Sequence, residues 1–107
     1  MQRATTDPRN GARDPGLLIL ASLAGGPRHG YAIVEDIVRF GGARLGPGTL
    51  YGALSRLEER GLVEALAAED RRRPYRLTGP GAQALRDYLR HARAVATVGL
   101  RRLAASS

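Results

Sequence analysis

The sequence contains no cysteine, no lysine and no tryptophan. Without cysteine, the chain has no disulfide framework, no thiolate nucleophile and no thiolate ligand for a metal. Without lysine, it has no Walker A phosphate-binding loop and no Schiff-base chemistry. Its two histidines are too few to suggest a metal site. We therefore expect no metal and no cofactor.

Patterns of catalysis and of membrane insertion are also missing. No nucleophile is placed with a histidine, and the carboxylates mostly fall on the surfaces of predicted helices, so we expect no catalytic residues. The one long apolar run, residues 17–24, is too short to span a membrane. A polar segment precedes it and two glycines follow it, unlike a signal peptide. We expect a cytoplasmic protein that is not an enzyme.

Arginine is what the chain has in excess. All 17 of its Lys+Arg residues are arginines, against 10 acidic residues, which gives a net charge of +7 in 107 residues. A GC-rich genome would by itself favour arginine, but a net charge of this size in one small domain favours a polyanionic partner. Arginine also forms paired hydrogen bonds with phosphate and guanine. The composition therefore suits nucleic-acid binding.

Capping residues and apolar spacing predict three helices in the first 60 residues. The first, over residues 15–24, begins with Asp14 as its N-cap and is apolar on nearly all sides, so we expect it to be buried. The second spans residues 30–40 and ends at two glycines. The third spans residues 47–60, with proline at its first position and a glycine after its last.

The side chains of the second and third helices separate into two faces. We expect core-facing stripes at helical spacing, made of Ile33, Ile37 and Phe40 in the second helix and of Leu50, Leu54 and Leu57 in the third. We expect the charged residues of the second helix to face solvent, namely Glu35, Asp36 and Arg39.

The remaining sequence predicts a β-hairpin and a long helix. Apolar residues at 62–66 and 75–77 flank a charged tip over residues 69–74. Thr78 is expected to cap a last helix that reaches about residue 104. Three short helices, a hairpin and a long helix predict a mainly α fold with a small β-hairpin, of the winged helix-turn-helix type with an added C-terminal helix.

Short motifs occur in order between residues 17 and 89, namely Gly30-Tyr31-Ala32-Ile33, Gly48-Thr49-Leu50-Tyr51, Arg56-Leu57-Glu58 with Gly61-Leu62-Val63, and Tyr75-Arg76-Leu77-Thr78 with Gly81. In this order and spacing they resemble the PadR family of bacterial transcriptional regulators. The resemblance implies homodimerisation through the C-terminal helix, and repression of nearby genes that a small-molecule effector relieves. With one C-terminal helix, the chain is similar to the compact branch of the family.

One face of the third helix is the predicted DNA-reading surface. The exposed N-terminal half of a recognition helix enters the major groove. Opposite the leucine stripe, a helical wheel places Gly48, Thr49, Gly52, Ser55 and Arg56. Arg56 is suited to guanine, and the glycines let the backbone approach the DNA. Tyr31 and Tyr51 are further candidates for DNA binding. For each of them two roles stay open, contact with a phosphate and packing between helices.

The predicted hairpin tip carries three consecutive arginines, Arg71, Arg72 and Arg73. The third helix is neutral, because two arginines balance two glutamates, so most of the affinity for phosphates has to come from elsewhere. We expect the tip at the flanking DNA backbone or minor groove. The alternative is a solvated turn in which these arginines pair with Glu69 and Asp70.

The last helix has an apolar and a basic face. The apolar face is the predicted dimer interface and consists of Leu85, Tyr88, Leu89, Ala92, Ala96 and Leu103. The other carries Arg86, Arg90 and Arg93, and its part in DNA binding stays open. The chain thus divides into a flexible basic tail (1–14), a winged helix-turn-helix DNA-binding domain (15–78) and a C-terminal dimerisation helix (79–107).

Three functions compete. The first is a homodimeric repressor that binds a pseudo-palindromic operator in double-stranded DNA. The second is a winged-helix module that binds a protein instead of DNA, but such a module would carry apolar residues where this chain has glycine, serine and arginine. The third is a membrane-surface protein, for which the last helix lacks anchoring Trp and Phe. We predict the DNA-binding repressor, with no membrane partner.

Overall fold

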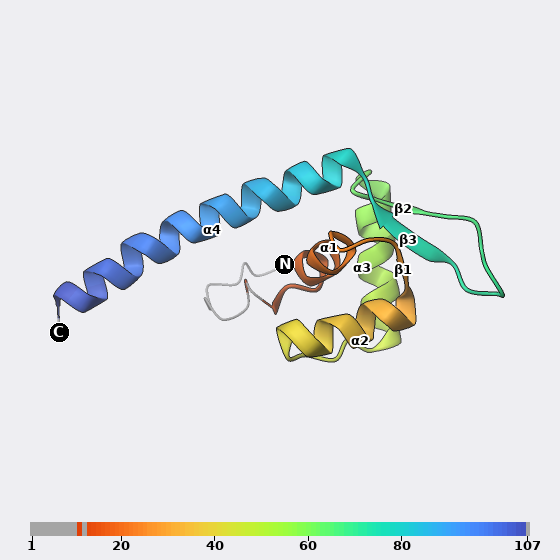
Figure 1. Cartoon of the computed structure of the whole chain (residues 1–107), viewed down its shortest axis with the longest axis horizontal. Coiled ribbons are helices and arrows are strands. Elements are labelled where there is room, and N and C mark those ends of the chain that lie inside the picture. Colours follow the sequence, from red (N-terminus) through yellow and green to blue (C-terminus); the bar gives the residue numbers. More distant parts are fainter. Residues whose placement is uncertain (1–10, 12, 107) are drawn as a thin grey trace, which may run out of the picture.

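The computed structural model describes residue 11 and residues 13–106. Its elements are α1 (Pro15–Leu23), β1 (Arg28–His29), α2 (Gly30–Gly41), α3 (Pro47–Glu59), β2 (Val63–Ala65), β3 (Pro74–Leu77) and α4 (Gly79–Ala105). The first three helices and the sheet pack together, while α4 runs away on one side and the loop between β2 and β3 projects on the other (Figure 1). The predicted fold class, mainly helical with a small antiparallel hairpin, is confirmed. The predicted basic tail lies mostly outside the described residues.

Side-chain caps and glycines set the helix boundaries close to those predicted. The Asp14 carboxylate accepts a hydrogen bond from the amide of Leu17 at 3.1 Å, and the Thr78 hydroxyl accepts one from the amide of Gly81 at 3.0 Å. Gly42, which follows α2, has a φ of 70°, and Gly61, which follows α3, has a φ of 75°. These left-handed conformations stop each helix at a residue without a Cβ.

The core surrounds α1, which is buried on several sides as predicted. Its partners are the predicted stripe of α3, two residues of α2, and one residue each from β2 and α4, namely Leu50, Leu54, Leu57, Ile33, Ile37, Val63 and Leu85. The expectation for Phe40 was wrong, because its side chain is 50% exposed. It lies in the last turn of α2, where Gly41, and not Phe40, is the residue beside Leu18 of α1.

The expectation that Asp36 faces solvent was also wrong. Its side chain is only 18% exposed, and its carboxylate accepts a hydrogen bond from the Ser22 hydroxyl at 2.8 Å. Ser22 belongs to α1, so the polar side chain of α2 is drawn toward the one hydroxyl on that helix. Its neighbour Glu35 forms an ion pair with Arg44 at 3.1 Å.

The sheet has three antiparallel strands in the order β1-β3-β2, where a two-stranded hairpin was expected. The added strand β1 pairs Arg28 with Tyr75 and His29 with Pro74. A strand of two residues leaves no alternating pattern in the sequence, which is why it was missed. The sheet joins α1 and α2 to the hairpin, which is the wing of this fold.

The start of α4 is fixed against the wing. The Thr78 hydroxyl donates a hydrogen bond to the carbonyl of Gly61 at 2.7 Å, and Gly81 lies so close to the Leu62 carbonyl that any Cβ would clash with it. From this point α4 extends outward over 27 residues. None of the helices in residues 13–106 is both long and apolar enough to cross a membrane.

Candidate DNA interface

The polar and small residues of α3 lie on one outward face, as the helical wheel predicted. Gly48, Thr49, Ser55 and Arg56 are exposed and Gly52 is half-buried, while the leucine stripe on the opposite side is buried. Pro47 at the first helical position begins α3 in an exposed segment, so the first turns of the helix are accessible. This face is the part of the helix-turn-helix that a DNA groove could receive.

The two glycines on this face are not required by the packing of the chain. A Cβ added at Gly48 would meet nothing within 4 Å, and one added at Gly52 would meet only the Arg56 guanidinium at 3.6 Å. Glycine inside a helix costs about 0.5–1 kcal/mol relative to alanine. Since the packing of the described residues leaves space for a Cβ at Gly52, its bare backbone suits close approach by a partner molecule.

Tyr51 and Tyr31 differ in their surroundings. The Tyr51 hydroxyl packs onto Gly30 at the start of α2, where it leaves no space for a Cβ. Packing between helices is therefore observed for Tyr51, although half of its surface stays exposed. Tyr31 is 69% exposed and lies beside Tyr51 on the rim of a shallow cavity that Arg44 also lines.

Tyr75 links the wing to α3. Burial raises the pKa of its hydroxyl, and the neighbouring Tyr51 and Glu58 raise this pKa further. The Tyr75 hydroxyl therefore stays protonated at neutral pH. Strand β3 thus lies beside the flank of α3 that carries Tyr51 and Glu58.

The wing tip is a tight turn with unusual backbone geometry. Glu69 and Arg72 exchange two backbone hydrogen bonds, at 2.6 and 2.8 Å, and between them Asp70 and Arg71 have φ values of 48° and 68°. Two left-handed residues at the centre define a type I′ hairpin turn, which usually contains Asn and Gly. Asp tolerates this conformation, whereas Arg71 adopts it at some cost in backbone strain.

The arginines of the tip form no ion pair with another described residue. Ion pairs in the described residues involve Arg28, Arg39, Arg44 and Arg76. None of them includes Arg71, Arg72 or Arg73, and all three of these side chains are exposed. This geometry disfavours the alternative in which the tip arginines pair with Glu69 and Asp70.

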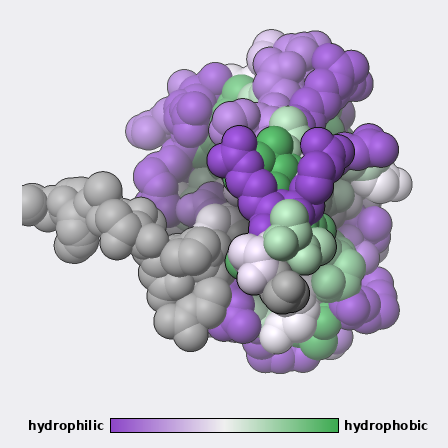
Figure 2. Space-filling view, turned by 90° about the vertical axis from the view of Figure 1, so that its left-hand side faces the viewer, coloured by the Kyte–Doolittle hydropathy of each residue, from purple (hydrophilic) through white to green (hydrophobic). Residues whose placement is uncertain are grey.

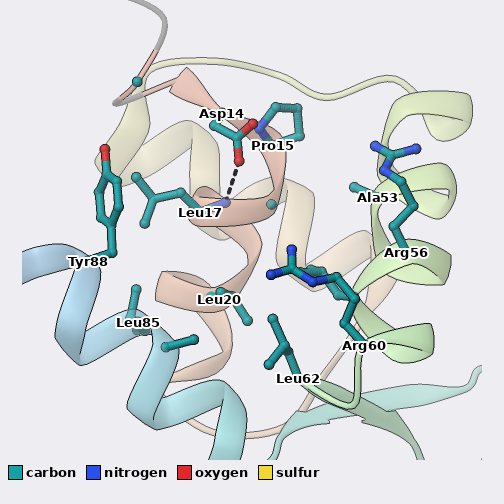
Figure 3. Close-up of a pocket in the computed structure, with 14 residues that line it drawn as sticks. Asp14, Pro15, Leu17, Leu20, Ala53, Arg56, Arg60, Leu62, Leu85 and Tyr88 are labelled. Carbon is teal, nitrogen blue, oxygen red and sulfur yellow. Dashed lines mark hydrogen bonds between the residues drawn. The ribbon is translucent and has the colours of Figure 1, made fainter.

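A cavity of about 540 Å³ lies between α1, α3 and the start of α4. Its walls are largely apolar, and Leu17, Leu20 and Leu85 contribute to them. In Figure 3 the Arg60 side chain extends from α3 toward α1, and the Tyr88 ring stands on the opposite side. The cavity thus combines largely apolar walls with two guanidinium groups, of Arg56 and Arg60, the Asp14 carboxylate and the Tyr88 hydroxyl.

The apolar face of α4 is exposed beyond its first turns. Leu85, a predicted interface residue, is instead buried in the chain's own core at 7% exposure, because the start of α4 packs against α1. The other five predicted residues lie farther along, and Ala92 alone of them is half-buried. Sequence reasoning overlooked three exposed apolar residues, Val95, Val98 and Leu100. In Figure 2, which views α4 from its C-terminal end, hydrophobic side chains lie at the surface among hydrophilic ones.

Comparison with known proteins identifies the family. The model of the family described as "Transcriptional regulator PadR-like family" matches residues 19–87, which is more than half of the chain. The chain belongs to the PadR-like family. This is a family of transcriptional regulators and not of enzymes.

Solved structures of PadR-like and related regulators share the fold. A PadR family transcription regulator from Clostridium difficile is 28% identical, with coverage of 83% of this chain and 97% of that chain, and a TM-score of 0.72. A transcriptional regulator from Clostridium thermocellum is 26% identical, with coverage of 90% and 94%, and a TM-score of 0.72. The match extends over α4 as well as the winged helix.

A longer protein contains a segment similar to this PadR-like chain. It is an uncharacterised 37.1 kDa protein in transposon Tn4556 of Streptomyces fradiae, 51% identical over 72 residues. The matching segment is 67% of this chain and 21% of that protein. The chain therefore spans about a fifth of the length of this curated relative.

Replacing Gly52 with alanine should separate the stability of α3 from its fit to DNA. The added methyl group clashes with no neighbouring atom, and alanine favours the helix over glycine, so the free energy of unfolding should rise by about 0.5–1 kcal/mol. Affinity for a DNA duplex selected from a random library should fall, because the methyl group occupies the space left for the groove. Thermal unfolding and fluorescence anisotropy measure the two effects.

Gly79→Ala is the control, since a Cβ there meets nothing within 4 Å and the residue lies at the start of α4, away from the α3 face. Equal DNA affinity of the Gly52→Ala variant and the unchanged protein would contradict close approach at Gly52.

Proposed function

We propose that this PadR-like chain is a sequence-specific DNA-binding regulator that acts as a homodimeric repressor on a pseudo-palindromic operator. The observation that carries the proposal is the exposed face of α3, whose glycines have no role in the chain's own packing. Arg56 on this face is exposed and forms none of the ion pairs found in the described residues. A free guanidinium beside a bare helix backbone suits a guanine edge in the major groove.

The wing supplies a second, nonspecific contact in this proposal. Three exposed arginines that form no ion pair within residues 13–106 can neutralise phosphates at the edge of the groove. Because Glu58 and Glu59 offset Arg56 and the C-cap residue Arg60, α3 adds little to this attraction. The reading of bases is thus assigned to α3, and much of the affinity for the backbone is assigned to the wing. Contacts of Tyr31 and Tyr51 with phosphates remain predictions.

The competing function is a winged-helix module that binds protein. Such a surface would need apolar anchors, whereas the exposed face of α3 offers glycine, threonine, serine and arginine. This composition favours DNA.

Selection from a random library of duplexes tests DNA binding and sequence specificity together. We expect enrichment of one pseudo-palindromic sequence. Arg56→Ala should lower affinity for that sequence by about 1–3 kcal/mol and leave binding to unrelated DNA nearly unchanged.

Replacing Arg71, Arg72 and Arg73 together with alanine should weaken binding to all sequences alike. It should also flatten the salt dependence, by about 0.9 in the log–log slope for each phosphate that the wing no longer neutralises. If no sequence is enriched and neither variant changes binding, the proposal is wrong.

Homodimerisation through α4 is supported by the exposed apolar residues on its outward part. Tyr88, Leu89, Val95 and Leu100 are all exposed, and a projecting helix of this kind gains little stability unless it packs against another element. A second copy of α4 would cover this surface and place two α3 helices on one DNA duplex.

Leu89→Asp should dissociate the dimer, because a carboxylate would be buried at the helix–helix contact. Light scattering should give the mass of a monomer, and operator affinity should fall. Thr97→Asp is the matched control, since it adds the same charge on the basic side of α4. A Leu89→Asp protein that stays dimeric would rule out this interface.

The cavity between α1, α3 and α4 is our proposed effector site. Its walls are largely apolar, and the two guanidinium groups in its lining, of Arg56 and Arg60, outnumber the single carboxylate of Asp14, which suits an aromatic carboxylic acid. Since Arg56 also lines this cavity, a bound acid would act on the same helix that reads DNA.

Benzoate, salicylate and naphthoate are suitable probes, and we expect at least one of them to bind in calorimetry and to release operator DNA. Arg60→Gln should abolish the binding, whereas Arg101→Gln, far along α4, should not. If no acid binds, or if both variants behave alike, the cavity is not the effector site.

A further inference from the structure

A partly buried polar cluster joins the end of α1, strand β1 and α2. The Ser22 side chain is only 1% exposed and donates a hydrogen bond to Oδ2 of Asp36 at 2.8 Å. Nη2 of Arg28 lies 3.6 Å from the same oxygen, and Nε of Arg28 donates to the Ser22 carbonyl at 3.1 Å. One carboxylate and one guanidinium therefore connect three elements.

The backbone of Arg28 belongs to the sheet of the wing. It pairs with Tyr75 of β3, and β3 pairs with β2 to form the hairpin. With only two residues, β1 contributes few hydrogen bonds to the sheet, which also contacts α1 through β3 and α3 through β2. The Arg28 side chain adds a polar connection to α1 and α2 at the β1 edge.

The loop after α1 is shaped to accept this arginine. A Cβ at Gly25 would lie 2.9 Å from Nη2 of Arg28, so the absence of a side chain there makes room for the guanidinium. Arg39 lies at the other oxygen of Asp36, at 3.5 Å, but is largely exposed. Asp36 is thus the acceptor shared by a hydroxyl and two guanidinium groups.

We propose that Asp36 and Arg28 are positioning residues, which fix the wing at the angle to α3 that lets both touch one DNA duplex. The inference rests on the proposed DNA binding but concerns residues outside the predicted contact surface. A partly buried ion pair is a weak source of stability, because the loss of solvation offsets much of its attraction. The presence of this ion pair is better explained by its geometry, which holds β1 in one orientation.

Asp36→Asn tests the proposal, with Glu35→Gln as the matched control. Both variants remove one negative charge from α2. Asp36→Asn removes the ion pairs with Arg28 and Arg39, whereas Glu35→Gln removes the pair with Arg44, which does not belong to β1. Loss of a negative charge should by itself strengthen DNA binding. We expect the opposite for Asp36→Asn, a loss of about 2- to 10-fold in operator affinity, and no loss for Glu35→Gln.

The route of the effect is tested in the variant whose three tip arginines are alanine. If Asp36 acts by positioning the wing, Asp36→Asn should cause no further loss of affinity in that background. An equal loss in both backgrounds would overturn the proposal, as would unchanged affinity of Asp36→Asn in the otherwise unaltered protein.

Amide hydrogen exchange gives a readout that does not depend on DNA. Asp36→Asn should speed exchange in residues 63–77 and leave the buried turns of α3 protected. Unchanged exchange in residues 63–77 would overturn the positioning role. If the unaltered chain fails to bind DNA, the proposed function fails, and this exchange experiment still decides whether Asp36 holds the wing.

Ser22→Ala is the second variant in case Asp36→Asn does not fold. It removes one hydrogen bond from the cluster and keeps both charges, so we expect a smaller change in the same direction. No change in exchange for Ser22→Ala would then count against the proposal.

Discussion

Burial of α1 is the constraint on which the rest of the structure depends. This helix is apolar on nearly all sides, and α2, α3, α4 and strand β3 all pack against it. Helices α2 and α3 therefore turn their apolar stripes toward α1 and their other faces toward solvent, and α4 does so only at its start. The outward face of α3 is exposed for this reason, and its position follows from the burial of Leu50, Leu54 and Leu57 on the opposite side.

The range of an interaction along the chain explains which parts of the fold the sequence could predict. Helix boundaries depend on local signals, such as the Asp14 and Thr78 caps, and these were predicted nearly to the residue. Strand β1 depends on pairing with Tyr75, far along the chain, and two residues carry no periodicity of their own. Asp36 was assigned to solvent because a wheel of α2 does not show that a hydroxyl of α1 lies opposite it.

The candidate DNA interface was predictable to a similar extent. The members of the α3 face follow from helical period alone, and the tip arginines follow from their place between two strands. What the sequence could not show is how charges are paired. Glu69 and Asp70 adjoin the tip arginines in the chain, yet the turn geometry leaves those arginines outside the ion pairs of residues 13–106. Leu85 likewise has the pattern of an interface residue, and only its contact with the core distinguishes it.

Recognition of bases and binding of the phosphate backbone require different residues, and in this chain separate elements would supply them. With its arginine offset by Glu58 and Glu59, α3 discriminates between bases only while it lies in the groove, and a charged wing adds affinity only when it reaches the same duplex. The angle between α3 and the wing then matters for both contacts. The sheet contacts α1 through β3 and α3 through β2, and at its β1 edge the Arg28 side chain adds a polar connection to α1 and α2. For a domain this small, a polar cluster at the edge of the core is therefore better explained by the orientation it imposes than by the stability it adds.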